Sequence, residues 1–107
     1  MKAGVSLESN GNLSVNGHLN LKGIEELTQL PHSLVSVNGD LSLRNCPNLL
    51  SLKNISVNGN LDVKDCINLT TMTNVSVDGY VITSGCRKLD YSSLSKELQR
   101  SIAGVME

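Results

Sequence analysis

The chain has 107 residues and a formal net charge of −1, from 9 basic and 10 acidic side chains. This length is that of one domain, which we expect to span residues 1–107. The balanced charge argues against nucleic acid as a partner, because a nucleic-acid binder needs a basic face to displace counterions. No run of residues approaches the ~20 apolar positions of a membrane span, so we expect no membrane partner either.

Residues 1–12 precede the regular part of the sequence and are expected to form an N-terminal edge piece. The segment from Val5 to Val15 contains the dipeptide Asn10-Gly11 near its middle. Asn-Gly favours the tight turns of hairpins, because both residues tolerate a positive φ. The sequence therefore allows a hairpin at this edge.

A short phrase recurs four times within residues 13–89. The copies are Val15-Asn16-Gly17, Val37-Asn38-Gly39, Val57-Asn58-Gly59 and Val77-Asp78-Gly79. Their spacings are 22, 20 and 20 residues. A fixed period near twenty residues marks a solenoid, in which the chain coils and each coil stacks on the last. The Gly after Asn or Asp predicts a sharp corner in each coil, because Gly accepts φ > 0.

An alternating pair of apolar residues follows each corner and predicts a short strand with an outward residue between two inward ones. The expected strands are Leu19–Leu21, Leu41–Leu43, Leu61–Val63 and Val81–Thr83. Apolar residues then recur every third position, which suits a tight arc that is neither helix nor strand. The first of these inward positions holds Ile24, Cys46, Cys66 and Cys86. We therefore predict a right-handed β-solenoid of about four coils over residues 13–89, with one parallel sheet.

The periodicity changes after Leu89. Five apolar positions then fall near helical spacing: Tyr91, Leu94, Leu98, Ile102 and Val105. Ser92 or Ser93 is a suitable N-cap. We expect an amphipathic helix over residues 90–107, because the last coil of a solenoid otherwise exposes its apolar layer and a free strand edge.

The stretch from Leu41 to Leu52, LSLRNCPNLLSL, resembles a leucine-rich repeat of the pattern L-x-L-x-x-N/C-x-x-L-x-x-L. The twenty-residue period and the pair Leu30-Pro31 resemble the short repeats of bacterial leucine-rich-repeat proteins, which include effectors that pathogens inject into host cells. Receptor L domains have similar repeats. The resemblance implies a recognition module that binds another protein through its strand face. The chain departs from the bacterial pattern because Leu-Pro occurs only once.

The three cysteines stand 20 residues apart, at one position of successive coils. An odd, evenly spaced set is a poor disulfide framework, which favours a reducing compartment such as the bacterial or host cytoplasm. We expect Cys46 and Cys66 to be buried, unpaired and without metal, because they align with the apolar Ile24. Cys86 is the exception, since neighbouring Arg87 and Lys88 could lower its pKa and make it reactive. Without a catalytic motif we expect no enzyme and no cofactor.

The outward strand positions form columns in successive coils. The columns are Lys22, Arg44, Lys64 and Ser84; Asn20, Ser42, Asp62 and Ile82; and His18, Asp40, Asn60 and Tyr80. The predicted binding residues are Lys22, Arg44, Lys64, Asp62, Tyr80 and Ile82. Stacked cations with an aromatic and an aliphatic side chain at one end suit an acidic protein surface, with Asp40 and Asp62 orienting the cations.

Two other readings stay open. The face could be polar only because a solenoid must be soluble. The chain could also be an assembly protein that forms a homo-oligomer through an exposed edge of the solenoid.

Overall fold

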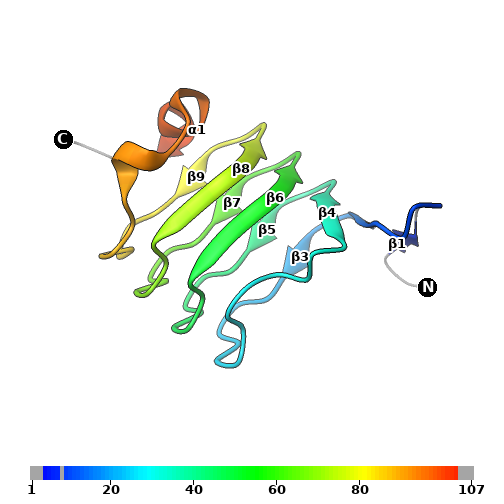
Figure 1. The fold of residues 1–107 in the computed structure, drawn as a ribbon, viewed down its shortest axis with the longest axis horizontal. Helices are drawn as coiled ribbons and strands as arrows, with labels where there is room; N and C mark the ends of the chain where they lie inside the picture. Colours follow the sequence, from blue (N-terminus) through cyan, green and yellow to red (C-terminus); the bar gives the residue numbers. More distant parts are fainter. Residues whose placement is uncertain (1–3, 8, 104–107) are drawn as a thin grey trace.

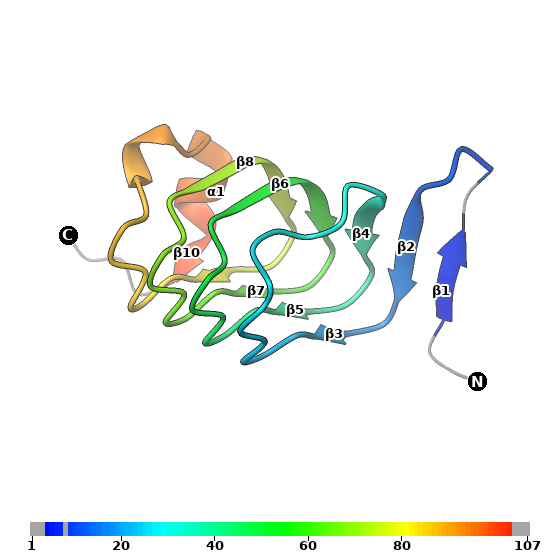
Figure 2. The ribbon, with the colours of Figure 1, turned by 60° about the horizontal axis from the view of Figure 1, so that its bottom comes forward.

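The computed structural model describes residues 4–7 and 9–103 and shows a β-solenoid of about four turns (Figure 1). Two five-stranded sheets enclose the core. Sheet A contains, in spatial order, β1 (Gly4–Leu7), β2 (Leu13–Asn16), β4 (Leu34–Val37), β6 (Ser51–Val57) and β8 (Thr71–Val77). Sheet B contains β3 (Leu19–Asn20), β5 (Leu41–Ser42), β7 (Leu61–Asp62), β9 (Val81–Ile82) and β10 (Ile102–Ala103). Figure 2 shows the coils running from one sheet to the other.

The short strands expected from the alternating pairs are confirmed as β3, β5, β7 and β9 of sheet B. They are parallel, and Leu19, Leu41, Leu61 and Val81 lie side by side in successive strands. Equivalent repeat positions therefore form straight columns across this sheet. The solenoid fold predicted from the period of the sequence is confirmed.

We predicted a single sheet joined by irregular arcs, but part of each arc forms a strand of a second sheet, sheet A. Strands β6 and β8 are seven residues long, yet their apolar residues do not alternate. The reason is a left-handed backbone at Asn54 and Asn74, where φ is 59° and 55°. This turn of the chain inside the strand buries Leu52 and Ile55, three positions apart. Asn74 Nδ2 donates to Asn54 Oδ1 at 2.8 Å, which bridges the two coils at the irregularity.

Sharp corners after the sheet B strands also use left-handed residues. Gly23, Asn45, Asp65 and Gly85 occupy this position with φ between 60° and 81°. Gly, Asn and Asp are the residues that tolerate such a conformation. Two successive turns follow in the second coil, where Cys46 N–H donates to the Leu43 carbonyl and Leu49 N–H donates to the Cys46 carbonyl. These turns form the expected arc with an inward residue at every third position.

The corners before the strands need glycine for a different reason from the one predicted. Gly17 has a φ of 142°, but Gly39, Gly59 and Gly79 are not among the residues with positive φ. A Cβ on Gly59 would collide with the Asp40 carboxylate and lie 2.9 Å from the backbone of Gly39. Lack of space between stacked coils, and not the sign of φ, requires glycine there.

Burial depends on the coil. Leu41, Leu43, Leu61 and Val63 are completely buried in the middle coils. The first coil is only partly covered, and Ile24 is 36% exposed although we predicted an inward position. No further coil of the described chain packs on this side, so the same repeat position meets solvent.

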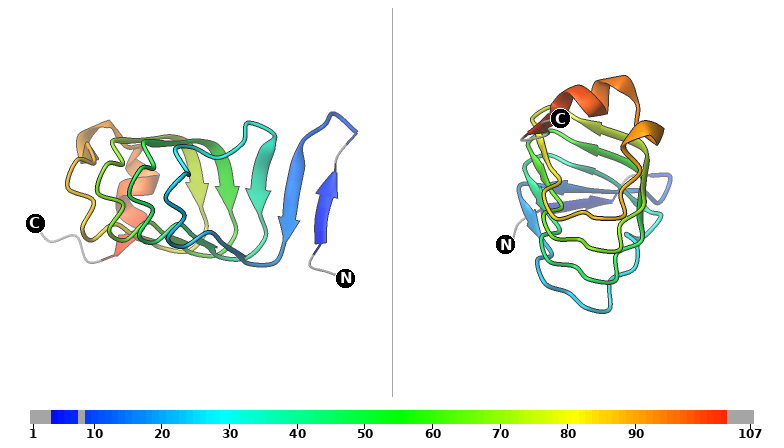
Figure 3. Two further views of the ribbon diagram at one scale, coloured as in Figure 1. Left: turned by 90° about the horizontal axis from the view of Figure 1, so that it is seen from below. Right: turned by 90° about the vertical axis from the view of Figure 1, so that its left-hand side faces the viewer.

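The N-terminal end carries the predicted hairpin, in which β1 pairs antiparallel with β2 and Val5 lies opposite Val15. Figure 3 shows this hairpin extending sheet A beyond the first coil. Sheet B starts at β3, and no strand of the described chain lies beyond it. Leu7, at the end of β1, is 72% exposed. This end of the solenoid is therefore less covered than the other.

The C-terminal cap is confirmed, but its helix is shorter than residues 90–107. A 3₁₀ turn, Tyr91–Ser93, precedes α1 (Lys96–Ser101), and Ser95 is the N-cap in place of Ser92 or Ser93. The chain then becomes β10, which pairs parallel to β9. Val105 lies outside the described residues. Within the described part of the chain, no helix is long and apolar enough to cross a membrane.

Candidate protein-binding face

Sheet B brings the predicted binding residues together as columns on its outer face. Asn20, Ser42, Asp62 and Ile82 are register partners in neighbouring strands. The cationic column beside them is continuous, because Gly23 N–H donates to the Arg44 carbonyl and Asn45 N–H donates to the Lys64 carbonyl, each at 2.9 Å. Neighbouring parallel strands lie ~4.8 Å apart, so the three cations span ~10 Å.

Asp62 holds Arg44 in place. Arg44 Nε donates to an Asp62 oxygen at 3.0 Å, and Arg44 Nη2 forms an ion pair with the same oxygen at 2.8 Å. The other carboxylate oxygen accepts the Lys64 N–H at 3.0 Å. The Asp62 side chain is 18% exposed and the Arg44 side chain 40%. Asp62 therefore orients the Arg44 guanidinium, as we expected, and leaves it open to solvent.

Asp40 does not orient the cations, contrary to our expectation. One of its oxygens accepts the Asn60 N–H at 2.8 Å, and the other lies 3.7 Å from His18 Nδ1. The column of His18, Asp40 and Asn60 instead joins the corners of successive coils, because each side chain accepts the N–H of the residue one coil later. Among the described residues, Lys22 and Lys64 form no ion pair.

Tyr80 and Ile82 lie toward the C-terminal end of the face. Tyr80 is 51% exposed, and its N–H donates to Asn60 Oδ1 at 3.0 Å. Ile82 is partly buried, and its register partner in the next strand, β10, is Ala103. The face therefore passes from cations at the first coils to an aromatic and an aliphatic side chain at the last.

The cysteine column is internal. Cys46, Cys66 and Cys86 are free and buried. Each thiol donates to a carbonyl of the preceding coil; for Cys66 the acceptor is Leu43 at 2.9 Å. Burial raises the pKa of Cys66 to about 12, although a backbone hydrogen bond from Cys46 opposes the rise. The expectation that Cys46 and Cys66 are buried and unpaired is confirmed.

Cys86 does not have the environment of a reactive thiol. Burial is the main reason why its pKa rises to about 11, and nearby Asp65 adds to the rise. Arg87 and Lys88 are exposed, and Lys88 Nζ donates to Asn68 Oδ1 at 2.8 Å. The suggestion that these two cations lower the pKa of Cys86 is wrong. In residues 4–7 and 9–103, no three His, Cys, Asp or Glu side chains gather closely enough to hold a metal ion.

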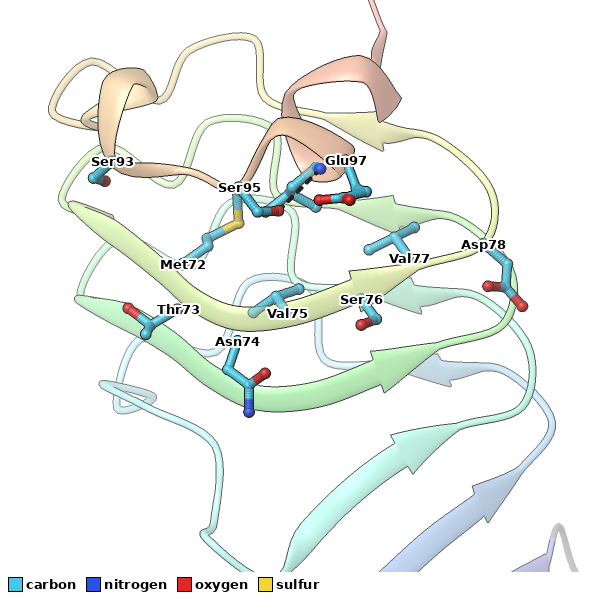
Figure 4. Close-up of a pocket in the computed structure, with 11 residues that line it drawn as sticks. Met72, Thr73, Asn74, Val75, Ser76, Val77, Asp78, Ser93, Ser95 and Glu97 are labelled. Atoms are coloured by element: carbon cyan, nitrogen blue, oxygen red, sulfur yellow. Dashed lines mark hydrogen bonds between the residues drawn. The ribbon is translucent and has the colours of Figure 1, made fainter.

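One surface was missed by the sequence analysis. A groove of about 510 Å³ runs beside β8 and faces the C-terminal segment (Figure 4). The groove could not be predicted for two reasons. Left-handed Asn74 interrupts the alternation that would identify β8 as a strand. The predicted helix also continued through the residues that form β10.

The sequence matches no known family model, and no curated protein or solved structure matches it either. The leucine-rich-repeat resemblance therefore rests on the residue pattern alone.

Proposed function

We propose that the protein is a non-enzymatic binding module that recognises an acidic surface of another protein through the outer face of sheet B. The observation that carries the proposal is the alignment of Lys22, Arg44 and Lys64 in the turns that follow three neighbouring strands, with Arg44 held by Asp62. A rigid cation loses little freedom on binding. Tyr80, half exposed at the end of the face, is the type of side chain that anchors interfaces.

The proposal includes the leucine-rich-repeat family and, within it, the bacterial effectors that act on host proteins. The repeat pattern of residues 41–52 supports this reading. Backbone turns after each sheet B strand, and thiols that donate to the preceding coil, are compatible with the L-x-L-x-x-N/C pattern.

The test compares two purified baits with equal charge changes. Lys22→Glu/Lys64→Glu reverses two cations of the face, and Lys53→Glu/Arg87→Glu reverses two exposed cations elsewhere. A partner captured by the wild type and by the second bait, but lost by the first, supports the proposal. Equal capture by both variants contradicts it. With the partner purified, Tyr80→Ala is expected to weaken binding by about 2 kcal/mol, measured by calorimetry.

A second candidate is assembly through the N-terminal end. It is favoured by the 72% exposure of Leu7 and by strand β3, whose outer edge has no described strand beside it. Unpaired strand edges promote association between chains. Sedimentation at several concentrations separates the candidates, because assembly through this end predicts a mass that rises with concentration and falls with Leu7→Lys.

A further inference from the structure

The C-terminal edges of the two sheets are finished differently. In sheet B, the short strand β10 adds to β9 in parallel and covers its edge. In sheet A, β8 is the last strand of the described chain, and its outer edge has no strand partner. Free N–H and C=O groups along such an edge can accept another extended chain as a new strand.

A groove lies along this open edge, between β8 and the segment that carries α1 (Figure 4). Its lining includes every residue from Met72 to Asp78, together with Ser93, Ser95, Glu97 and Leu98. Met72, Val75 and Leu98 are already buried, so a ligand would cover little new apolar surface. The exposed lining is polar, and the affinity of a bound chain would come mainly from main-chain hydrogen bonds and charge.

The charges of the groove have one sign. Asp78 and Glu97 are its charged lining residues, both are exposed, and no Lys, Arg or His lines it. Asp78 follows the end of β8, and Glu97 lies in the first turn of α1 across from Val77 (Figure 4). A cationic side chain is therefore the complement of this end.

We propose that the groove binds an extended segment of a partner protein, which adds to β8 as the next strand of sheet A and places a Lys or Arg beside Asp78 and Glu97. β10 illustrates the same mode of addition at the neighbouring edge. This surface is separate from the cationic face of sheet B and would select an oppositely charged part of a partner.

The first experiment measures charge preference. The probe is a fluorescein-labelled octapeptide, Ser-Leu-Thr-Asn-Ile-Ser-Val-Lys, which copies the β6 segment that already pairs with β8, with Thr in place of Lys53 and a final Lys in place of Asn58. Fluorescence anisotropy with the full chain should show saturable binding, weakened at least ~5-fold when the last residue is Glu. Asp78→Asn/Glu97→Gln should abolish this difference. Asp78→Asn is a conservative change, because Asn58 occupies the same position of the preceding coil.

The second experiment tests strand addition. Two versions of the peptide carry N-methyl groups on alternate residues after the Asn, at positions 5 and 7 in one version and at positions 6 and 8 in the other, because left-handed Asn54 and Asn74 break the alternation before that point. A strand pairs through one edge, so one version should bind ~10-fold more weakly and the other like the parent peptide. Any other result, or no binding of the parent peptide, overturns the proposal.

A third measurement separates this site from the sheet B face and from self-association. Lys22→Glu/Lys64→Glu should bind the peptide unchanged; if it does not, the peptide occupies sheet B and the groove proposal is wrong. Above saturation, the bound fraction of peptide should stay constant as the protein concentration is raised further. A bound fraction that falls as the mass in sedimentation doubles would assign β8 to a second copy of the chain and overturn the proposal of a partner segment.

Discussion

The first coil (residues 19–40) and the third coil (residues 61–80) carry the same repeat but have different surroundings. Leu61 and Val63 are completely buried, whereas Leu19 and Leu21 at the equivalent positions are only partly buried. Cys66 is completely buried, whereas Ile24 is 36% exposed. In a solenoid, burial depends on having a neighbouring coil on each side, and the residue pattern alone does not determine it.

The largest effect expected from this difference concerns a buried charge. Leu43→Asp, at a completely buried position of the second coil, should prevent folding, with a loss above about 4 kcal/mol, because an unpaired carboxylate would lie in the apolar core. Leu21→Asp, at the matching position of the first coil, should remain folded, with a loss of about 1–2 kcal/mol. Urea unfolding followed by circular dichroism measures both, and equal losses would refute the comparison.

An intermediate effect is expected at the corners. Gly59→Ala should destabilise the protein by about 2–3 kcal/mol, because the new methyl group meets Asp40 and the Gly39 backbone of the preceding coil. Gly23, in the first coil, has a φ of 76° and no atom within 4 Å of an added Cβ. Gly23→Asn should therefore change stability by less than about 1 kcal/mol, since Asn45 adopts this conformation in the next coil. Thermal unfolding of the two variants decides whether space or φ governs each corner.

The smallest effect is a pH dependence. The pKa of Cys66 is about 12 in the folded protein against 9.0 ordinarily, so its contribution to stability is complete below pH 9 and is lost as pH rises toward 12. Between about pH 8 and about pH 10, the wild type should lose about 1 kcal/mol more than Cys66→Val in urea unfolding. If the two losses are the same, Cys66 does not ionise on unfolding.

The first coil supplies the matched control for that thiol. Ile24→Cys places a cysteine at the exposed equivalent position. A thiol reagent at neutral pH should label this one site rapidly in the native protein and leave the three native cysteines unreacted. Labelling of Cys66 at a similar rate would show that the third coil is not protected.

The sequence predicts sheet B and its register, because the Leu-x-Leu pairs alternate and recur at a fixed period. It does not predict sheet A, because left-handed Asn54 and Asn74 give β6 and β8 the three-residue spacing of a turn. The predicted C-terminal helix is too long for a similar reason. Ile102 fits helical spacing, but it also fits beside Val81 at a free strand edge, where pairing satisfies the backbone.

The columns of the candidate face follow from the same register, so Lys22, Arg44 and Lys64 could be aligned from the sequence. The hydrogen-bond partner of each individual side chain could not be predicted. Asp40 and Asp62 stand in neighbouring outward columns, but Asp62 pairs with Arg44 while Asp40 accepts the Asn60 N–H. A difference of two residues along the coil decides whether a carboxylate meets a side chain or the next corner.

Many of the side-chain hydrogen bonds between coils run in one direction, with consequences for how the protein is made. The Cys66 thiol donates to the Leu43 carbonyl, Asn58 donates to Asn38, and Asn74 donates to Asn54. In each case the acceptor belongs to the coil that leaves the ribosome earlier. In these three bonds the emerging coil donates to acceptors on the coil made before it, which suits the addition of coils one after another from the N-terminus during synthesis.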